Sequence, residues 1–254
     1  MSVVFVSDFG PFPAVENDAY TDALAELGRT LPKPRAIVIM SGHWETRWPI
    51  AVTAAETPGI VHDYSGFPQE FYRLDYPSPG DPALARRIAE RLTARRISAV
   101  TDPNRPLDHG AWVPLSRMYP DADIPVVQVT VPATPGESLK IGEVLAEELT
   151  DDVLLVGSGA LSHNLRLIFA HGKDDAPDEW ALEFDDWWMD RLRDGRTEDL
   201  LNFKKTAPSA DLAVPTLDHI NPFFFSLGAA KGTPPAVFHQ SIRYGNGLMK
   251  ILTF

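Results

Sequence analysis

The chain has 254 residues, a formal net charge of −12 at pH 7 and no cysteine. The negative charge makes nucleic acid and anionic lipid poor partners for its surface. The lack of cysteine excludes disulfides, thiolate chemistry, iron–sulfur clusters and cysteine-bound zinc. Any metal must be bound by His, Asp or Glu side chains. No stretch approaches the roughly 20 apolar residues needed to span a bilayer and the N-terminus lacks a signal-peptide pattern, so we expect a cytoplasmic protein.

Short apolar runs predict buried strands in chain order, at residues 3–7, 36–41, 50–54, 125–131 and 153–158. Each run is continuous rather than alternating, which is typical of strands that are buried on both faces of a sheet. The C-terminal stretch "PAVFHQSIRYGNGLMKILTF" predicts two further strands joined near "YGNG".

Amphipathic patterns predict helices over residues 17–31, 81–96, 136–150 and 179–193. Asn17 is a candidate N-cap for the first helix, and Asp81 with Pro82 is a fitting N-cap and N1 pair for the second. The alternation of strands and helices predicts an α/β fold with a mostly parallel or mixed central sheet flanked by helices. We find no domain boundary, and we expect residues 1–254 to form a single domain.

Three titratable residues stand near the ends of predicted strands. Asp8 follows the first strand, His43 follows the second, and His163 lies beyond the strand at 153–158. Ligands of open α/β sheets bind outside the carboxyl ends of the strands. We therefore expect an active site at that edge of the sheet, where these three side chains converge.

More histidines lie in similar settings. His109 lies in a loop framed by Gly and Pro, His219 precedes an apolar helical run, and His62 falls in the Pro/Gly-rich, aromatic segment 59–80. A single histidine beside an apolar run is usually a structural residue held by a hydrogen bond. The repetition of this setting favours a shared site.

Histidine and carboxylate ligands without sulfur suit Fe(II), Zn(II) or Mn(II). Two histidines and one carboxylate form the triad of non-haem Fe(II) oxygenases, which leaves positions open for substrate and O₂. Asp8, His43 and His219 could form such a triad. A further histidine near the open face would then be available as an acid or base.

Several ordered blocks resemble the class III extradiol ring-cleaving dioxygenases (the LigB-type superfamily), in particular the branch of DOPA 4,5-dioxygenases. The blocks are "SDFGPFPAVENDAY", "PRAIVIMSGHWET", "TPGIVHDYSGFPQEFYRLDYPSPGDPALA", "PLDHGAWVPLSRMYPDADIPVVQVTV", "LLVGSGALSHNLR" and "LDHINPFFFSLGAA". The resemblance covers nearly the whole chain. It implies that O₂ is inserted next to the diol of a small catechol-type aromatic to give a muconic semialdehyde.

The resemblance also implies a role for each histidine. His43 and His219 match metal ligands, His163 matches the catalytic acid/base, and His109 matches an active-site residue near substrate and oxygen. Where the branch has a further ligand histidine, this sequence has Asp8. Asp8 is interpreted as a ligand because the other blocks are intact.

Alternatives stay open at this stage. The loss of an imidazole at residue 8 can instead mark weaker metal binding and changed or lost oxygen chemistry. A zinc-dependent hydrolase on the same scaffold, or a non-catalytic relative, would follow from that interpretation. His62 and Tyr244 are candidates for the substrate pocket, and both a monomer and a homodimer are compatible with the sequence.

Overall fold

A single mixed sheet of eight strands organises the protein in the computed structural model, which describes residues 2–168 and 170–254. The strands are β1 (Val3–Ser7), β2 (Ala36–Glu45), β3 (Ile50–Thr53), β4 (Ala99–Asp102), β5 (Val126–Val131), β6 (Val153–Gly159), β7 (Ala236–Arg243) and β8 (Gly247–Thr253). Their order across the sheet is β4-β3-β5-β2-β6-β1-β8-β7. The predicted α/β fold with a mixed central sheet is confirmed.

The four central strands β5, β2, β6 and β1 are parallel to one another. The strand β3 is antiparallel to β5 and parallel to β4, and the hairpin of β8 and β7 adds antiparallel to β1. The carboxyl ends of β1, β2 and β6 therefore open on the same edge of the sheet.

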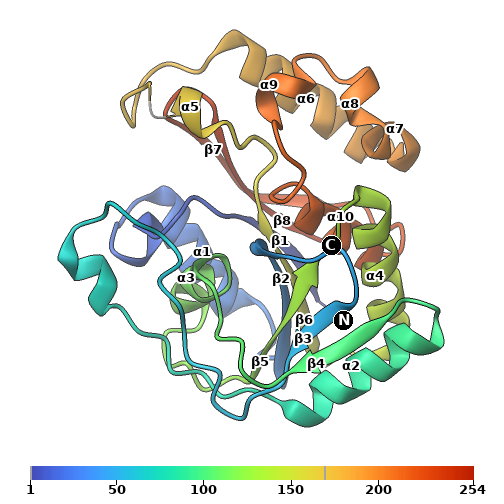
Figure 1. Ribbon diagram of the computed structural model, residues 1–254. Coiled ribbons are helices and arrows are strands. Elements are labelled where there is room, and N and C mark those ends of the chain that lie inside the picture. Colours follow the sequence, from blue (N-terminus) through green and yellow to red (C-terminus); the bar gives the residue numbers. More distant parts are fainter. Residues whose placement is uncertain (1, 169) are drawn as a thin grey trace.

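Helices cover both faces of this sheet, as Figure 1 shows. The α-helices are α1 (Ala19–Thr30), α2 (Pro82–Ala94), α3 (His109–Met118), α4 (Pro135–Glu148), α5 (Leu165–Ile168), α6 (Glu179–Arg193), α7 (Thr197–Leu201), α8 (Phe203–Thr206), α9 (Ala210–Ala213) and α10 (Asn221–Ala229), and two 3₁₀ turns are η1 (Phe12–Ala14) and η2 (Gln69–Arg73). Helices α1 and α3 pack on one face and α2, α4 and α10 on the other. Helices α6 to α9 pack beside α10 in a third cluster. No helix in the described ranges has the length and apolarity that a bilayer span requires.

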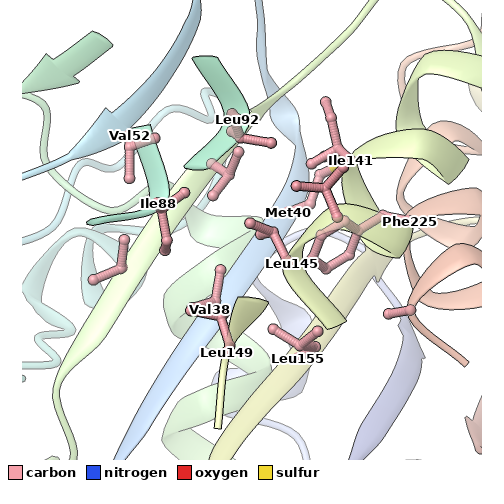
Figure 2. Close-up of a cluster of buried hydrophobic side chains, with 14 of the residues drawn as sticks. Val38, Met40, Val52, Ile88, Leu92, Ile141, Leu145, Leu149, Leu155 and Phe225 are labelled. Atoms are coloured by element: carbon pink, nitrogen blue, oxygen red, sulfur yellow. The ribbon is translucent and has the colours of Figure 1, made fainter. Parts of the chain in front are cut away.

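Both faces of β2 are buried. Figure 2 shows Val38 and Met40 against Leu145 of α4 and Phe225 of α10. The alternate residue Ile39 packs on the opposite face, against α1 and α3. Two-sided burial explains the continuous apolar run, and each such side chain contributes about 1.5–3 kcal/mol to stability.

Two details of the predicted helix starts are wrong. The N-cap of α1 is Asp18 rather than Asn17, because the Asp18 carboxylate accepts hydrogen bonds from the Tyr20 and Thr21 amides, both at 3.1 Å. His109 lies in a helix rather than a loop: it is the first residue of α3, which Asp108 caps. The predicted cap and N1 pair of α2, Asp81 and Pro82, is confirmed.

Candidate active site

Asp8 is fixed directly after β1. Its amide donates to the Gly159 carbonyl at 2.6 Å, which continues the pairing of β1 with β6 by one residue. Its Oδ1 accepts from the Gly10 amide at 3.1 Å. Gly10 has a φ of 66°, the left-handed conformation that glycine adopts without strain. The turn leaves Oδ2 of the buried Asp8 side chain to face His43.

His43 lies near the C-terminal end of β2, where the pairing register with β5 shifts between Met40 and Glu45. Its Nε2 lies 2.8 Å from Asp8 Oδ2 and 3.1 Å from His219 Nε2. The strand predicted to end at residue 41 thus continues through His43. This irregular end brings an oxygen and two nitrogens of the predicted triad together.

His219 is oriented by its own neighbour. Asp218 Oδ2 accepts a hydrogen bond from His219 Nδ1, so Nε2 remains available for a ligand. The carbonyl of His219 accepts from the Ala160 amide at 2.7 Å, which joins the residue to the end of β6. A carboxylate on the remote nitrogen of a histidine is the arrangement that orients metal ligands in proteins.

His163 stacks on His219. The ring centroids are 3.6 Å apart and the planes differ by 8°. Its amide donates to the Ala213 carbonyl at 2.8 Å, which fixes the loop after β6. Burial and the adjacent His219 lower the pKa of His163 to about 3. The ring is therefore neutral at neutral pH.

His109 is oriented by Asp63. The carboxylate Oδ1 of Asp63 accepts from the His109 amide at 3.0 Å and from Nδ1 at 2.8 Å. The ring of His109 lies 3.8 Å from that of His43, centroid to centroid. Because Asp63 takes Nδ1, Nε2 is the nitrogen that His109 can offer to a bound molecule.

Within the described residues, two groups bring three possible ligand atoms within 4.8 Å of one another. One group is Asp8, His43 and His109, and the other is His163, Asp218 and His219. The predicted triad takes members from both groups, which meet at the contact between His43 and His219.

The donor atoms fit a divalent cation. One carboxylate oxygen and two imidazole nitrogens suit Fe(II), Zn(II) or Mn(II). Neighbouring ligands about 2.1 Å from one ion lie about 3 Å apart, and the distances of 2.8 Å and 3.1 Å from His43 Nε2 match that spacing. The donor types of Asp8, His43 and His219, and the two distances from His43 Nε2, are therefore compatible with a divalent cation.

The charges of Asp8 and His43 are complementary. Burial opposes ionisation of Asp8, but His43, His109 and His219 together hold its pKa below the ordinary value. Burial also disfavours charged His43, yet Asp8 raises its pKa to about 9. A divalent cation held by these donors would require His43 to be deprotonated.

A cavity of about 290 Å³ opens beside these donors. Its polar end contains all five predicted catalytic and metal-binding residues, and the remainder of the wall is mainly aromatic and aliphatic. The lining residues are Asp8, Phe9, Gly10, Pro11, Phe12, His43, Asp63, Tyr64, Ser65, Phe67, His109, His163, Leu165, Ile168 and His219.

The two predicted substrate contacts, His62 and Tyr244, are absent from that described lining. His62 Nε2 lies 3.0 Å from the Leu74 carbonyl, and its ring packs against Tyr64, which does line the cavity. Tyr244 stacks on Phe9 at 5.5 Å between centroids. Both residues thus pack against side chains that line the cavity, and their contact with substrate stays a prediction.

Sequence reasoning missed two carboxylates, Asp63 and Asp218. Each stands one position before or after a histidine, in "HDY" and "LDHIN", and such adjacency is a signal for a carboxylate that orients a ring. Only Asp218 orients its sequence neighbour, however. Asp63 acts on His109, which is 46 residues away.

Comparison with known proteins identifies the family of this chain. Residues 7–253 match the family described as the catalytic LigB subunit of aromatic ring-opening dioxygenase. A 4,5-DOPA dioxygenase extradiol of Escherichia coli K12 is 39% identical over 241 residues, which cover 92% of this chain and 87% of that protein. The protein of the same name from Beta vulgaris is 35% identical and covers 96% of this chain and 92% of its own length.

A solved structure shares the fold. The crystal structure of an uncharacterized protein from Escherichia coli K12 superposes with a TM-score of 0.83 at 34% identity, and the match covers 100% of this chain and 99% of that one. The family match and these identities over nearly full length leave one conclusion. The chain belongs to the LigB family of aromatic ring-opening dioxygenases, and it is an oxidoreductase of the metal-dependent extradiol class.

Proposed function

We propose that this chain is an Fe(II)-dependent extradiol dioxygenase that opens the ring of a small catechol and yields a muconic semialdehyde. Residues 1–254 would form the single catalytic domain. The observation that carries the proposal is the convergence of Asp8 Oδ2, His43 Nε2 and His219 Nε2. The cavity beside them suits one aromatic ring.

Asp8, His43 and His219 are the proposed metal ligands. Fe(II) bound there would supply positions at which both diol oxygens and O₂ are held side by side. Asp8 adds one negative charge to the ligand set, which lowers the net charge of a divalent site from +2 to +1. That donor set is the one found in non-haem Fe(II) oxygenases.

His163 is the proposed acid/base. Its neutral ring accepts a proton from a diol hydroxyl and returns that proton as the ring opens. The stacking on His219 fixes the His163 ring next to a ligand, where a diol hydroxyl must lie. His109, held by Asp63, presents Nε2 for a hydrogen bond to the substrate or the reacting oxygen.

Loading the purified chain with Fe(II) under anaerobic conditions, followed by catechol and air, tests this proposal. We expect iron-dependent O₂ uptake and a new visible absorption band from the ring-opened product. Asp8→Ala should abolish both signals, whereas Asp22→Ala, which removes an exposed carboxylate of α1, should leave them unchanged.

Two outcomes would contradict the proposal. His163→Ala with ring cleavage at the wild-type rate would remove His163 from the acid/base role. Tight zinc binding together with no O₂ uptake on any catechol would instead support a hydrolase on this scaffold, with the water activated by zinc.

A further inference from the structure

We propose that the preferred substrate is a catechol whose ring substituent is apolar and uncharged. This inference rests on the proposed function, and it concerns the part of the cavity that the ring-opening chemistry does not use. DOPA, the compound in the names of the relatives, has a side chain with a carboxylate and an ammonium group. The wall of this cavity is built for a different substituent.

The wall beyond the histidines is a continuous run of apolar rings. Tyr64 lies edge-on to His109, with 5.5 Å between centroids, and it contacts Phe67 at 5.3 Å. Phe67 in turn contacts Phe12 at 5.2 Å. A substituent that extends from a ring at the histidines would therefore meet aromatic surface, and burying apolar groups there is favourable.

The lining also has an aliphatic part. Leu165 is 47% exposed and Ile168 is buried, and both side chains line the cavity. An apolar group of the substrate that covers this exposed leucine removes apolar surface from water, which favours binding. Ser65 is the only serine or threonine in the described lining.

The charges of the cavity disfavour an anionic substituent. Within the described ranges the lining includes the carboxylates of Asp8 and Asp63 but no lysine or arginine. Nearby cations are engaged elsewhere: Lys173 pairs with Glu16 at 2.6 Å, and Arg117 donates to the Glu16 carbonyl at 2.6 Å. A carboxylate on the substrate would lose water without gaining a lysine or arginine partner in the described wall.

A matched pair of catechols tests the inference. Propylcatechol and dihydrocaffeate differ only in that a carboxylate replaces the terminal methyl group. We expect kcat/KM for propylcatechol to exceed that for dihydrocaffeate by about tenfold or more, a ratio that corresponds to about 1.4 kcal/mol. Equal or faster turnover of dihydrocaffeate would overturn the inference.

Variants at the mouth give a second readout. Leu165→Lys adds a cation to the wall at an exposed position, so it should lower the ratio of the two kcat/KM values by about two- to fivefold, the range of one exposed ion pair. Leu165→Met is the matched control and should keep the wild-type ratio. Arg166→Ala should also keep it, because Arg166 is exposed and does not line the cavity. An unchanged ratio in Leu165→Lys would contradict the placement of the substituent.

Anaerobic calorimetric titration of the iron-loaded protein separates this inference from the proposed function. The titration ranks the two catechols by Kd without any turnover. Tighter binding of dihydrocaffeate would overturn the substrate class even where O₂ is consumed. Tighter binding of propylcatechol without O₂ uptake would support the substrate class and count against the dioxygenase proposal alone.

Discussion

Replacing Gly110 with alanine should damage the metal site while the fold survives. A Cβ atom at residue 110 would lie 2.2 Å from Ser41 Oγ, 2.8 Å from Asp8 Oδ2 and 2.9 Å from His43 Cδ2. Ordinary contact begins near 3.4 Å, so Ser41 Oγ must retreat by about 1.2 Å and Asp8 Oδ2 by about 0.6 Å. Two of the three proposed ligands are therefore displaced by one methyl group.

The expected magnitudes differ for stability and for metal binding. Overpacking a core costs about 1–3 kcal/mol, and the gain from replacing glycine in a helix offsets about 0.4–1 kcal/mol of that loss. The net loss is small enough for a chain of this size to remain folded. Displacing the ligands, by contrast, should cost about 10–100-fold in metal affinity, as disturbing the residues that orient ligands does.

Gly136→Ala is the matched control. Gly136 occupies the second position of α4, as Gly110 does in α3, but a Cβ there meets nothing within 4 Å. It should gain about 0.4–1 kcal/mol of stability and bind metal as the wild type does. Thermal unfolding measures the first quantity and competition with a chelator measures the second. Wild-type metal affinity in Gly110→Ala would refute the close packing of α3 against Asp8 and His43.

Three further predictions address other parts of the molecule. Asp218→Asn should weaken metal binding by about 10–100-fold in chelator competition, because it removes the carboxylate that orients His219. Lys250 and Asp185 form an ion pair at 2.9 Å with side chains 1% and 5% exposed. Lys250→Met alone should therefore lower the unfolding free energy measured in urea by about 3–5 kcal/mol, whereas the double variant with Asp185→Leu should recover most of that loss. Equal losses in the single and the double variant would contradict a buried pair. Removing bound metal should lower the unfolding free energy by about 2.7 kcal/mol relative to protein held at a free metal concentration about 100-fold above Kd, and an unchanged Tm would show that the metal binds the unfolded chain equally well.

The sequence predicts the sheet well where burial is two-sided. Continuous apolar runs such as residues 36–41 have no other common explanation, and each of the five predicted strands is present. The strand β4 was missed because its residues are half-buried or exposed at the edge of the sheet, so "AVTD" carries no continuous apolar run. The short helices α7 to α9 were missed for a related reason. They are held by packing against α10 rather than by a periodic pattern of their own.

The site was predictable in its residues and less so in its geometry. The rule that ligands gather at the carboxyl ends of strands brought Asp8, His43 and His163 together correctly. No local pattern connects Asp63 with His109, however, because that pair depends on how the loop after β3 folds over the start of α3. The cavity wall was equally hidden, since its rings come from loops whose sequence does not determine which side chains turn inward.

Asp8 presents the sharpest question, since an aspartate reaches less far than the histidine of the resembling branch. The gap is closed by the backbone around it. The Asp8 amide extends the pairing of β1 with β6, and Oδ1 accepts from the Gly10 amide in a tight turn, so that Oδ2 is directed at His43. Gly110 provides the space, since its missing Cβ would lie 2.8 Å from that oxygen. The stretch "DFG" and a glycine about a hundred residues later thus set the position of the carboxylate, and Gly110→Ala tests this placement directly.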